Sequence, residues 1–137
     1  MVYVFDASFL NALIIPDKHN IQVKRMYDKI ENEDERYAPQ LIWYETASIF
    51  HKLIRHKRYS YNEVLQFFPR VVAFNLTIDS ESGAEYTEKL LHLSNDYNIS
   101  AYDAAYLELA GRKKAVLCTL DEGLKAAARK YGVTTLK

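Results

Sequence analysis

The chain has 137 residues, 49% of them hydrophobic and only four Gly and three Pro, which predicts one domain over residues 1–137 without a long linker. Lys plus Arg and Asp plus Glu number 18 each, so net charge excludes a general electrostatic attraction to nucleic acid. The single Cys118 excludes an intramolecular disulfide, and the lack of a signal peptide and of any run of ~20 apolar residues predicts a cytoplasmic protein outside the membrane.

The first half of the chain predicts one strand followed by several helices. Residues 2–5 form a short apolar run, typical of a strand that is covered on both faces. We expect a helix over 7–15, which Pro16 stops, and the spacing of apolar residues predicts a second helix over about 20–33. Pro39 is placed to open a third, long helix that ends near residue 58. Ser60 and Glu63 form a capping-box pattern for a fourth helix, which reaches about residue 68.

The second half alternates strands with helices. A strand is expected within 71–78 and a helix over 80–96, and Ser100 can cap a further helix that Gly111 ends. A strand over 115–119, a helix over 121–131 and a last short strand over 133–136 complete the chain. This alternation predicts an α/β fold with a central parallel sheet of four to five strands flanked by helices.

Four acidic residues occupy special positions in this arrangement. Asp6 and Asp121 each end an apolar run, Glu45 lies inside an apolar helix, and Asp103 opens another helix. Such positions can converge on the crevice outside the strand C-termini, where open parallel sheets bind ligands. Four carboxylates in one crevice repel one another unless a cation lies between them, and Mg²⁺ or Mn²⁺ prefers oxygen ligands of this kind.

Each acid also has a purely structural explanation. Asp6 and Asp121 can cap the helices that follow them, and Asp103 lies three residues after Ser100, where the acid of a capping box would stand. Glu45 lies at the edge of the apolar arc of its helix, where a carboxylate without a nearby cation is costly.

Two hydroxyl side chains lie close to the strand-end acids in the sequence. Ser8 follows Asp6 by two residues, and Thr119 precedes Asp121 by two. Either hydroxyl could orient a metal-bound ligand or bond a backbone group at a helix end.

Taken together, these residues resemble a PIN-domain ribonuclease. The similarity covers essentially the whole chain, through Phe5-Asp6-Ala7-Ser8, Glu45 in a mid-chain helix, Tyr102-Asp103-Ala104-Ala105-Tyr106, and Leu117-Cys118-Thr119-Leu120-Asp121. The size resembles the VapC toxins of type II toxin–antitoxin modules. The resemblance implies an Mg²⁺- or Mn²⁺-dependent endoribonuclease that forms a homodimer and is neutralised by a small cognate antitoxin.

Carried across by residue, the resemblance makes Asp6, Glu45, Asp103 and Asp121 the catalytic, metal-binding acids, with Asp6 and Asp103 as the first candidates for direct ligands. Many relatives carry a further acid shortly after the last of these, but here Gly123 and Leu124 follow Glu122, which favours four acids over five.

An acidic pocket needs nearby cations to hold RNA. Lys52 and His56 fall within ~20° of Glu45 on the helical wheel, and with Arg55 they form a candidate RNA-binding group. The alternative is a solvated helix end, where the macrodipole favours cations. Tyr44 and Tyr102 flank pocket acids and are candidates for stacking on bases.

Two other functions compete with the nuclease. A phosphatase or phosphotransfer domain could use a strand-end Asp as nucleophile, although this leaves Glu45 without a role. A non-catalytic PIN-like binding module would use only its partner surface. For a homodimer, the apolar face of the first two helices is the candidate contact.

Overall fold

Four parallel strands form the sheet, in the order β3-β2-β1-β4. The computed structural model describes residues 1–16 and 21–137. The strands are β1 (Val2–Phe5), β2 (Glu35–Pro39), β3 (Thr77–Asp79) and β4 (Val116–Cys118). In the middle of the sheet, Val4 of β1 pairs with Tyr37 of β2 on one side and with Leu117 of β4 on the other. The predicted parallel sheet flanked by helices is confirmed, with four strands.

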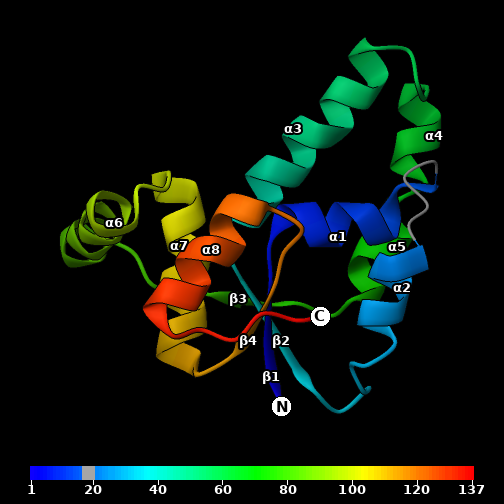
Figure 1. Ribbon diagram of the computed structural model, residues 1–137. Helices are drawn as coiled ribbons and strands as arrows, with labels where there is room; N and C mark the ends of the chain where they lie inside the picture. Colours follow the sequence, from blue (N-terminus) through cyan, green and yellow to red (C-terminus); the bar gives the residue numbers. More distant parts are fainter. Residues whose placement is uncertain (17–20) are drawn as a thin grey trace.

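Helices cover both faces of this sheet. The described residues form α1 (Ala7–Ile14), α2 (Ile21–Tyr27), α3 (Leu41–Arg55), α4 (Tyr61–Leu65), α5 (Phe68–Ala73), α6 (Ala84–Tyr97), α7 (Ala101–Lys113) and α8 (Glu122–Tyr131). Figure 1 shows α6, α7 and α8 on one side of the sheet and α1, α2 and α5 on the other. In the same view α3 extends away from the sheet, and α4 lies beside its far end. None of the helices described here has the length and apolar character needed to cross a lipid bilayer.

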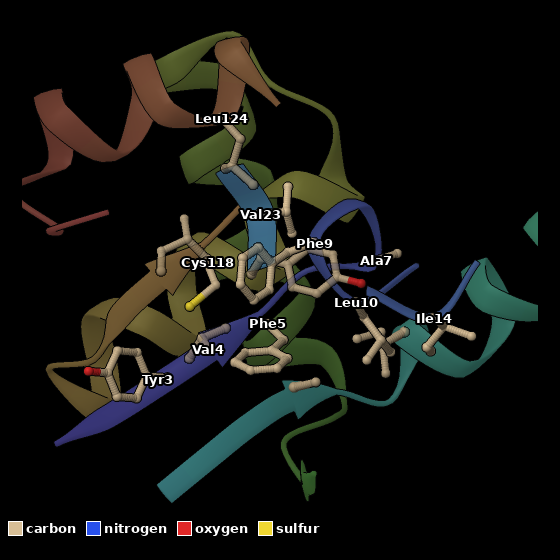
Figure 2. Packing of buried hydrophobic residues seen from close by; sticks show 14 of the residues in the cluster. Tyr3, Val4, Phe5, Ala7, Phe9, Leu10, Ile14, Val23, Cys118 and Leu124 are labelled. Carbon is tan, nitrogen blue, oxygen red and sulfur yellow. The ribbon is translucent and has the colours of Figure 1, made fainter. Parts of the chain in front are cut away.

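The core is built around β1, because helices exclude water from both of its faces. Val4 and Phe5 have no solvent-exposed surface, and the Phe5 ring meets the Phe9 ring edge-on at 5.1 Å between centroids. Figure 2 shows these side chains packed with Leu10 of α1 and Cys118 of β4. Burial raises the pKa of the Cys118 thiol, so this residue behaves as a small apolar side chain.

The prediction was wrong between residues 27 and 40. The second helix ends at Tyr27 rather than near 33, and its expected start at residue 20 lies outside the described part of the chain. A strand, β2, follows where none was expected, and Pro39 ends this strand instead of opening α3. The guanidinium of Arg36 explains the turn, because it donates hydrogen bonds to the carbonyls of Glu31, Asn32 and Asp34.

Smaller differences concern α3 to β3 and the C-terminal segment. α3 ends at Arg55 and not near residue 58, and the expected fourth helix is two short helices, α4 and α5. The strand expected within 71–78 begins only at Thr77, since residues 71–73 belong to α5. α6 begins at Ala84, four residues later than predicted.

The last predicted strand, 133–136, is a single parallel bridge between Leu117 and Thr135. Two backbone bonds support it: Leu117 N donates to Thr134 O at 2.8 Å and Leu136 N donates to Leu117 O at 2.9 Å. The segment therefore lies along the outer edge of β4.

One ion cluster fastens α7 to the far edge of the sheet. Arg112 of α7 donates from Nε to Glu108 Oε1 at 2.7 Å and from an Nη nitrogen to Asp79 Oδ2 at 2.6 Å. The two carboxylates are largely buried, with side-chain exposures of 6% for Glu108 and 9% for Asp79. Each would be left as a poorly solvated charge without the guanidinium, so the cluster contributes to stability as a unit.

We predict that Arg112→Ala lowers the free energy of unfolding by about 3 kcal/mol, because it leaves two buried carboxylates unpaired. Urea unfolding at neutral pH measures this change. Lys24→Ala is the control, since it removes an exposed pair with Asp28 and should cost less than about 1 kcal/mol. Equal losses in the two variants would contradict a structural role for the cluster.

Candidate functional site

Two strand ends place two of the four acids at the same edge of the sheet. β1 ends at Phe5 and β4 at Cys118, and these strands run parallel with Phe5 paired to Cys118. Asp6 follows the first strand directly and caps α1 by accepting from Phe9 N at 2.9 Å. Asp121 caps α8 by accepting from Leu124 N at 2.7 Å. Both acids therefore have the capping role that the sequence allowed, at the C-terminal edge where open parallel sheets bind ligands.

Asp6 is the most completely held of the four carboxylates. Ser8 Oγ donates to its Oδ1 at 2.7 Å, and the Thr119 hydroxyl donates to its Oδ2. The same two hydroxyls accept from backbone, Ser8 from Leu120 N and Thr119 from Asp121 N, both at 3.0 Å. Ser8 and Thr119 thus join the start of α1 to the turn between β4 and α8, and they fix the carboxylate between these two segments.

Burial disfavours the charged form of the Asp6 carboxyl. Only 5% of the residue is exposed, and burial raises the pKa of its carboxyl from 3.8 to about 6. The hydrogen bonds from Ser8, Thr119 and Phe9 N oppose this rise, and the negative charge of Asp103 adds to it. Among the residues that the structure describes, no basic side chain is one of the groups that set this pKa.

The Asp103 carboxyl interacts electrostatically with each of the other three acids. It is half-buried in the first turn of α7, where its backbone N–H donates to the cap residue Ser100. Burial raises the pKa of its carboxyl, and the negative charges of Asp121 and Glu45 raise it further. The structure therefore brings the predicted acids within one another's electrostatic influence, with Asp103 coupled to the other three.

Glu45 is held by a side chain that sequence reasoning did not single out. Tyr106 of α7 donates its hydroxyl to Glu45 Oε1 at 2.6 Å, and only 2% of Tyr106 is exposed. Burial and this bond to a carboxylate raise the pKa of the Tyr106 phenol, so it remains a donor. The only sequence signal was its place in Asp103-Ala104-Ala105-Tyr106, one helical turn after a pocket acid.

A second unpredicted contact joins α1 to α3. Asn11 Nδ2 donates to Ala7 O at 2.8 Å and to Thr46 Oγ1 at 3.3 Å. Asn11 and Thr46 are 2% and 4% exposed, so this polar link is inside the protein. Because Thr46 adjoins Glu45, the link sets the position of that acid relative to the helix that Asp6 caps.

The donor chemistry of these acids suits a divalent cation. The carboxylates supply the oxygen ligands that Mg²⁺ and Mn²⁺ prefer, and their mutual repulsion would fall when a cation binds. Over residues 1–16 and 21–137, no three or more Asp, Glu, His or Cys side chains already converge around a point that could hold an ion. The four acids thus fit a metal by chemistry and charge, and their assignment as ligands stays a prediction.

A groove of about 370 Å³ opens beside Glu45. It is lined by Tyr44, Glu45, Ser48, Ile49 and Lys52 of α3 and by Tyr102 of α7. Lys52 of the candidate RNA-binding group therefore shares a groove with a pocket acid. The other two members do not line it: Arg55 is the last residue of α3, His56 is its C-cap, and both are exposed. Glu122 is likewise turned to solvent, where its 86% exposed side chain pairs with Lys125.

Comparison with known proteins agrees with this architecture. The model of the PIN domain matches residues 3–130. Ribonuclease VapC3 of Pyrobaculum aerophilum is 28% identical over 124 residues, which cover 90% of this chain and 92% of that protein.

Solved structures share the fold at lower identity. The crystal structure of PAE2754 from Pyrobaculum aerophilum superposes with a TM-score of 0.69 at 22% identity, covering 93% of this chain and 87% of that one. A toxin–antitoxin complex from Klebsiella pneumoniae gives a TM-score of 0.60 at 17% identity, covering 87% of this chain and 86% of that one.

The raised pKa of Asp6 predicts how stability depends on pH in metal-free protein. Folding favours the protonated carboxyl, so this contribution to stability is fully present below about pH 4 and is lost as the pH rises through about 6. Asp6→Asn keeps a capping oxygen but removes the charge. We predict that the free energy of unfolding of this variant at pH 7.5 exceeds that of wild type by roughly 1–3 kcal/mol. Each unit by which folding raises the carboxyl pKa corresponds to ~1.4 kcal/mol.

Urea titrations between pH 3.5 and 8 in the presence of EDTA measure this difference. The advantage of Asp6→Asn should shrink to nothing near pH 4. A constant difference across the whole range would contradict the burial of a costly charge at Asp6.

Proposed function

The chain belongs to the PIN-domain family, and from that membership we propose that it is an Mg²⁺- or Mn²⁺-dependent endoribonuclease, the toxin of a toxin–antitoxin pair. The observation that carries the proposal is that the Asp103 carboxyl interacts with the charges of Asp6, Glu45 and Asp121, while burial and neighbouring carboxylates raise the pKa values of Asp6 and Asp103. A site with so much uncompensated negative charge is suited to a hard cation and to a substrate held through that cation.

In this proposal Asp103 and Asp6 are the first metal ligands, and Glu45 and Asp121 complete the set. A bound divalent ion would supply charge neutralisation of the phosphodiester and activation of water. The protein contributes orientation: Ser8 and Thr119 hold Asp6, and Tyr106 holds Oε1 of Glu45. Among the described residues, Oε2 of Glu45 accepts no hydrogen bond and is the oxygen left for the site.

The proposed protein partners are a small antitoxin and a second copy of the chain. The similarity to Ribonuclease VapC3 and to the fold of a toxin–antitoxin complex supports the antitoxin. For the homodimer, the contact expected on the apolar face of the first two helices stays a prediction, and α4 and α5 offer a second candidate. The apolar side chains of α1 and α2 mostly pack in the core, whereas Leu65, Phe68 and Val72 of α4 and α5 are 44%, 46% and 75% exposed. We assign a protein contact to α4 and α5.

A phosphotransfer mechanism with Asp6 as nucleophile has less support. Oδ1 of Asp6 accepts hydrogen bonds from Ser8 Oγ and Phe9 N, and Oδ2 accepts one from Thr119, which stabilises the carboxylate and weakens it as a nucleophile. The role would also leave Glu45 and its bond to Tyr106 unexplained. A non-catalytic binding module is distinguished from the nuclease by the assay below.

We predict that the protein cleaves single-stranded RNA in the presence of Mn²⁺ and not in the presence of EDTA. Asp103→Asn should lower the cleavage rate at least 100-fold, because it removes the charge that interacts with all three other acids. Gel analysis of end-labelled RNA measures the rate. Asp96→Asn is the matched control, since Asp96 is an exposed acid on α6, and it should cleave at the wild-type rate.

Wild-type protein that binds no Mn²⁺ by calorimetry and cleaves no RNA would support the binding module instead. Cleavage that survives in EDTA would refute the metal-dependent mechanism.

We predict that Tyr106→Phe weakens Mn²⁺ binding by about tenfold, since groups that orient metal ligands typically contribute 10–100-fold to affinity. The phenyl ring preserves the packing, so the free energy of unfolding should change by only about 1 kcal/mol. Calorimetric titration with Mn²⁺ measures the effect without depending on activity. Tyr3→Phe is the control, because Tyr3 is also buried but lies at the start of β1, away from the acids; equal Mn²⁺ affinities for the two variants would refute the positioning role.

A further inference from the structure

Two exposed aromatic rings border the groove beside Glu45. Tyr44 is 70% exposed and Tyr102 is 66% exposed, and they reach the groove from α3 and α7 respectively. Each ring belongs to the residue immediately before a pocket acid, Glu45 in one case and Asp103 in the other. The groove is therefore an aromatic extension of the acidic site.

The Tyr44 and Tyr102 rings have no identified structural role in the described part of the fold. Buried rings such as Phe5, Phe9 and Phe50 meet other rings edge-on, but Tyr44 and Tyr102 make no ring contact or side-chain hydrogen bond with any residue that the structure describes. Large aromatic surfaces exposed at the mouth of a groove are typical of binding sites, because they gain contact area only when a ligand arrives.

A cation stands at the other end of the same groove. Lys52 lies seven residues after Glu45 on α3, or ~10 Å along the helix axis, and Ser48 and Ile49 fill the interval. The Lys52 ammonium forms no ion pair with any described residue, so it is available to an anion. The groove is thus lined by a carboxylate, by aromatic rings and by an ammonium group. Its volume of about 370 Å³ is in the range of small-ligand pockets.

We propose that this groove is a base-stacking subsite for single-stranded RNA, in which an unpaired base packs on Tyr44 and Tyr102 and a neighbouring phosphate binds Lys52. The inference rests on the proposed nuclease function and adds to it a reason for substrate choice. Bases in a duplex already stack on one another, so only an unpaired strand can place a base on these rings. The subsite would select single-stranded RNA and hold it next to the acids.

The combination of exposed aromatic rings and a cation in one groove favours RNA over a protein ligand. A stacked base needs a flat aromatic surface, and its backbone needs a cation nearby, and both are present within one groove. A protein partner has a different surface available in the exposed apolar side chains of α4 and α5.

The test uses Asp103→Asn as background, so that RNA binds without being cut. Fluorescence anisotropy with a labelled 10-nucleotide single-stranded RNA in EDTA measures the dissociation constant. Tyr44→Ala and Tyr102→Ala should each weaken binding about tenfold or more, whereas Tyr44→Phe and Tyr102→Phe, which keep the ring, should change it less than about threefold. Tyr61→Ala is the matched control, since Tyr61 is 63% exposed but lies on α4, outside the groove.

Salt dependence separates stacking from charge. Lys52→Ala should reduce the slope of log affinity against log salt by about 0.7, the value for one phosphate contact on a single strand, and Tyr44→Ala should leave the slope unchanged. Duplex RNA of the same sequence should bind more weakly and should not respond to Tyr44→Ala.

Several results would overturn the subsite. Unchanged RNA binding by Tyr44→Ala and Tyr102→Ala, both shown to be folded by their melting curves, would do so even if the wild type cleaves RNA, and the nuclease proposal would then stand alone. If these variants instead lose self-association in sedimentation while RNA binding is unaffected, the groove is a protein interface. Conversely, loss of binding in the Ala variants of a wild type that never cleaves RNA would keep the subsite and remove the nuclease.

Discussion

The buried carboxylate of Asp6 joins two of the segments on which the site is built, the start of α1 and the turn between β4 and α8. It caps α1 through Phe9 N, and it receives hydrogen bonds from Ser8 in that helix and from Thr119 after β4. Since Ser8 and Thr119 also accept backbone N–H groups from the turn before α8, a shift of either segment breaks bonds to the other. The position of Asp121 is therefore a consequence of the way in which Asp6 is held.

This arrangement has an energetic cost that is located at the site itself. Burial and like charges raise the carboxyl pKa values of Asp6 and Asp103, which means that the folded protein would be more stable without these charges. By contrast, the carboxylates of Asp79 and Glu108, which are also largely buried, are paired with Arg112. The buried acids that hold the fold together are thus paired with a base, whereas Asp6 and Asp103 at the candidate site form no ion pair with any described residue, a distribution expected of a functional site.

Much of this could be predicted from residue patterns, and what was missed has physical reasons. Asp6 and Asp121 were recognisable because an apolar strand run ends just before each. β2 was missed because its sequence, Glu35-Arg36-Tyr37-Ala38-Pro39, has a charged start and no apolar alternation; the strand forms because β1 and β3 pair with its two edges. Val71 and Val72 favour a strand locally, yet they lie in α5, where Pro69 occupies the first turn.

The contacts that orient the acids were beyond the reach of local patterns. Tyr106 bonds Glu45 across 61 positions of sequence, and Asn11 bonds Thr46 across 35. Such pairs depend on how α1, α3 and α7 approach one another in the folded chain, and neither tyrosine nor asparagine is unusual in a helix. Positions of single acids follow from secondary structure, whereas their orientation follows from tertiary packing.

The edges of the sheet bear on how this protein can meet a partner. At one edge β3 has only three residues, Thr77–Asp79, and its last side chain is bound by Arg112. At the other edge the C-terminal segment already bonds both backbone groups of Leu117. A short, charged edge and a covered one both discourage strand addition and edge-to-edge aggregation. Association with another chain must accordingly use helical surfaces and side chains, since the sheet offers no long unpaired strand to extend.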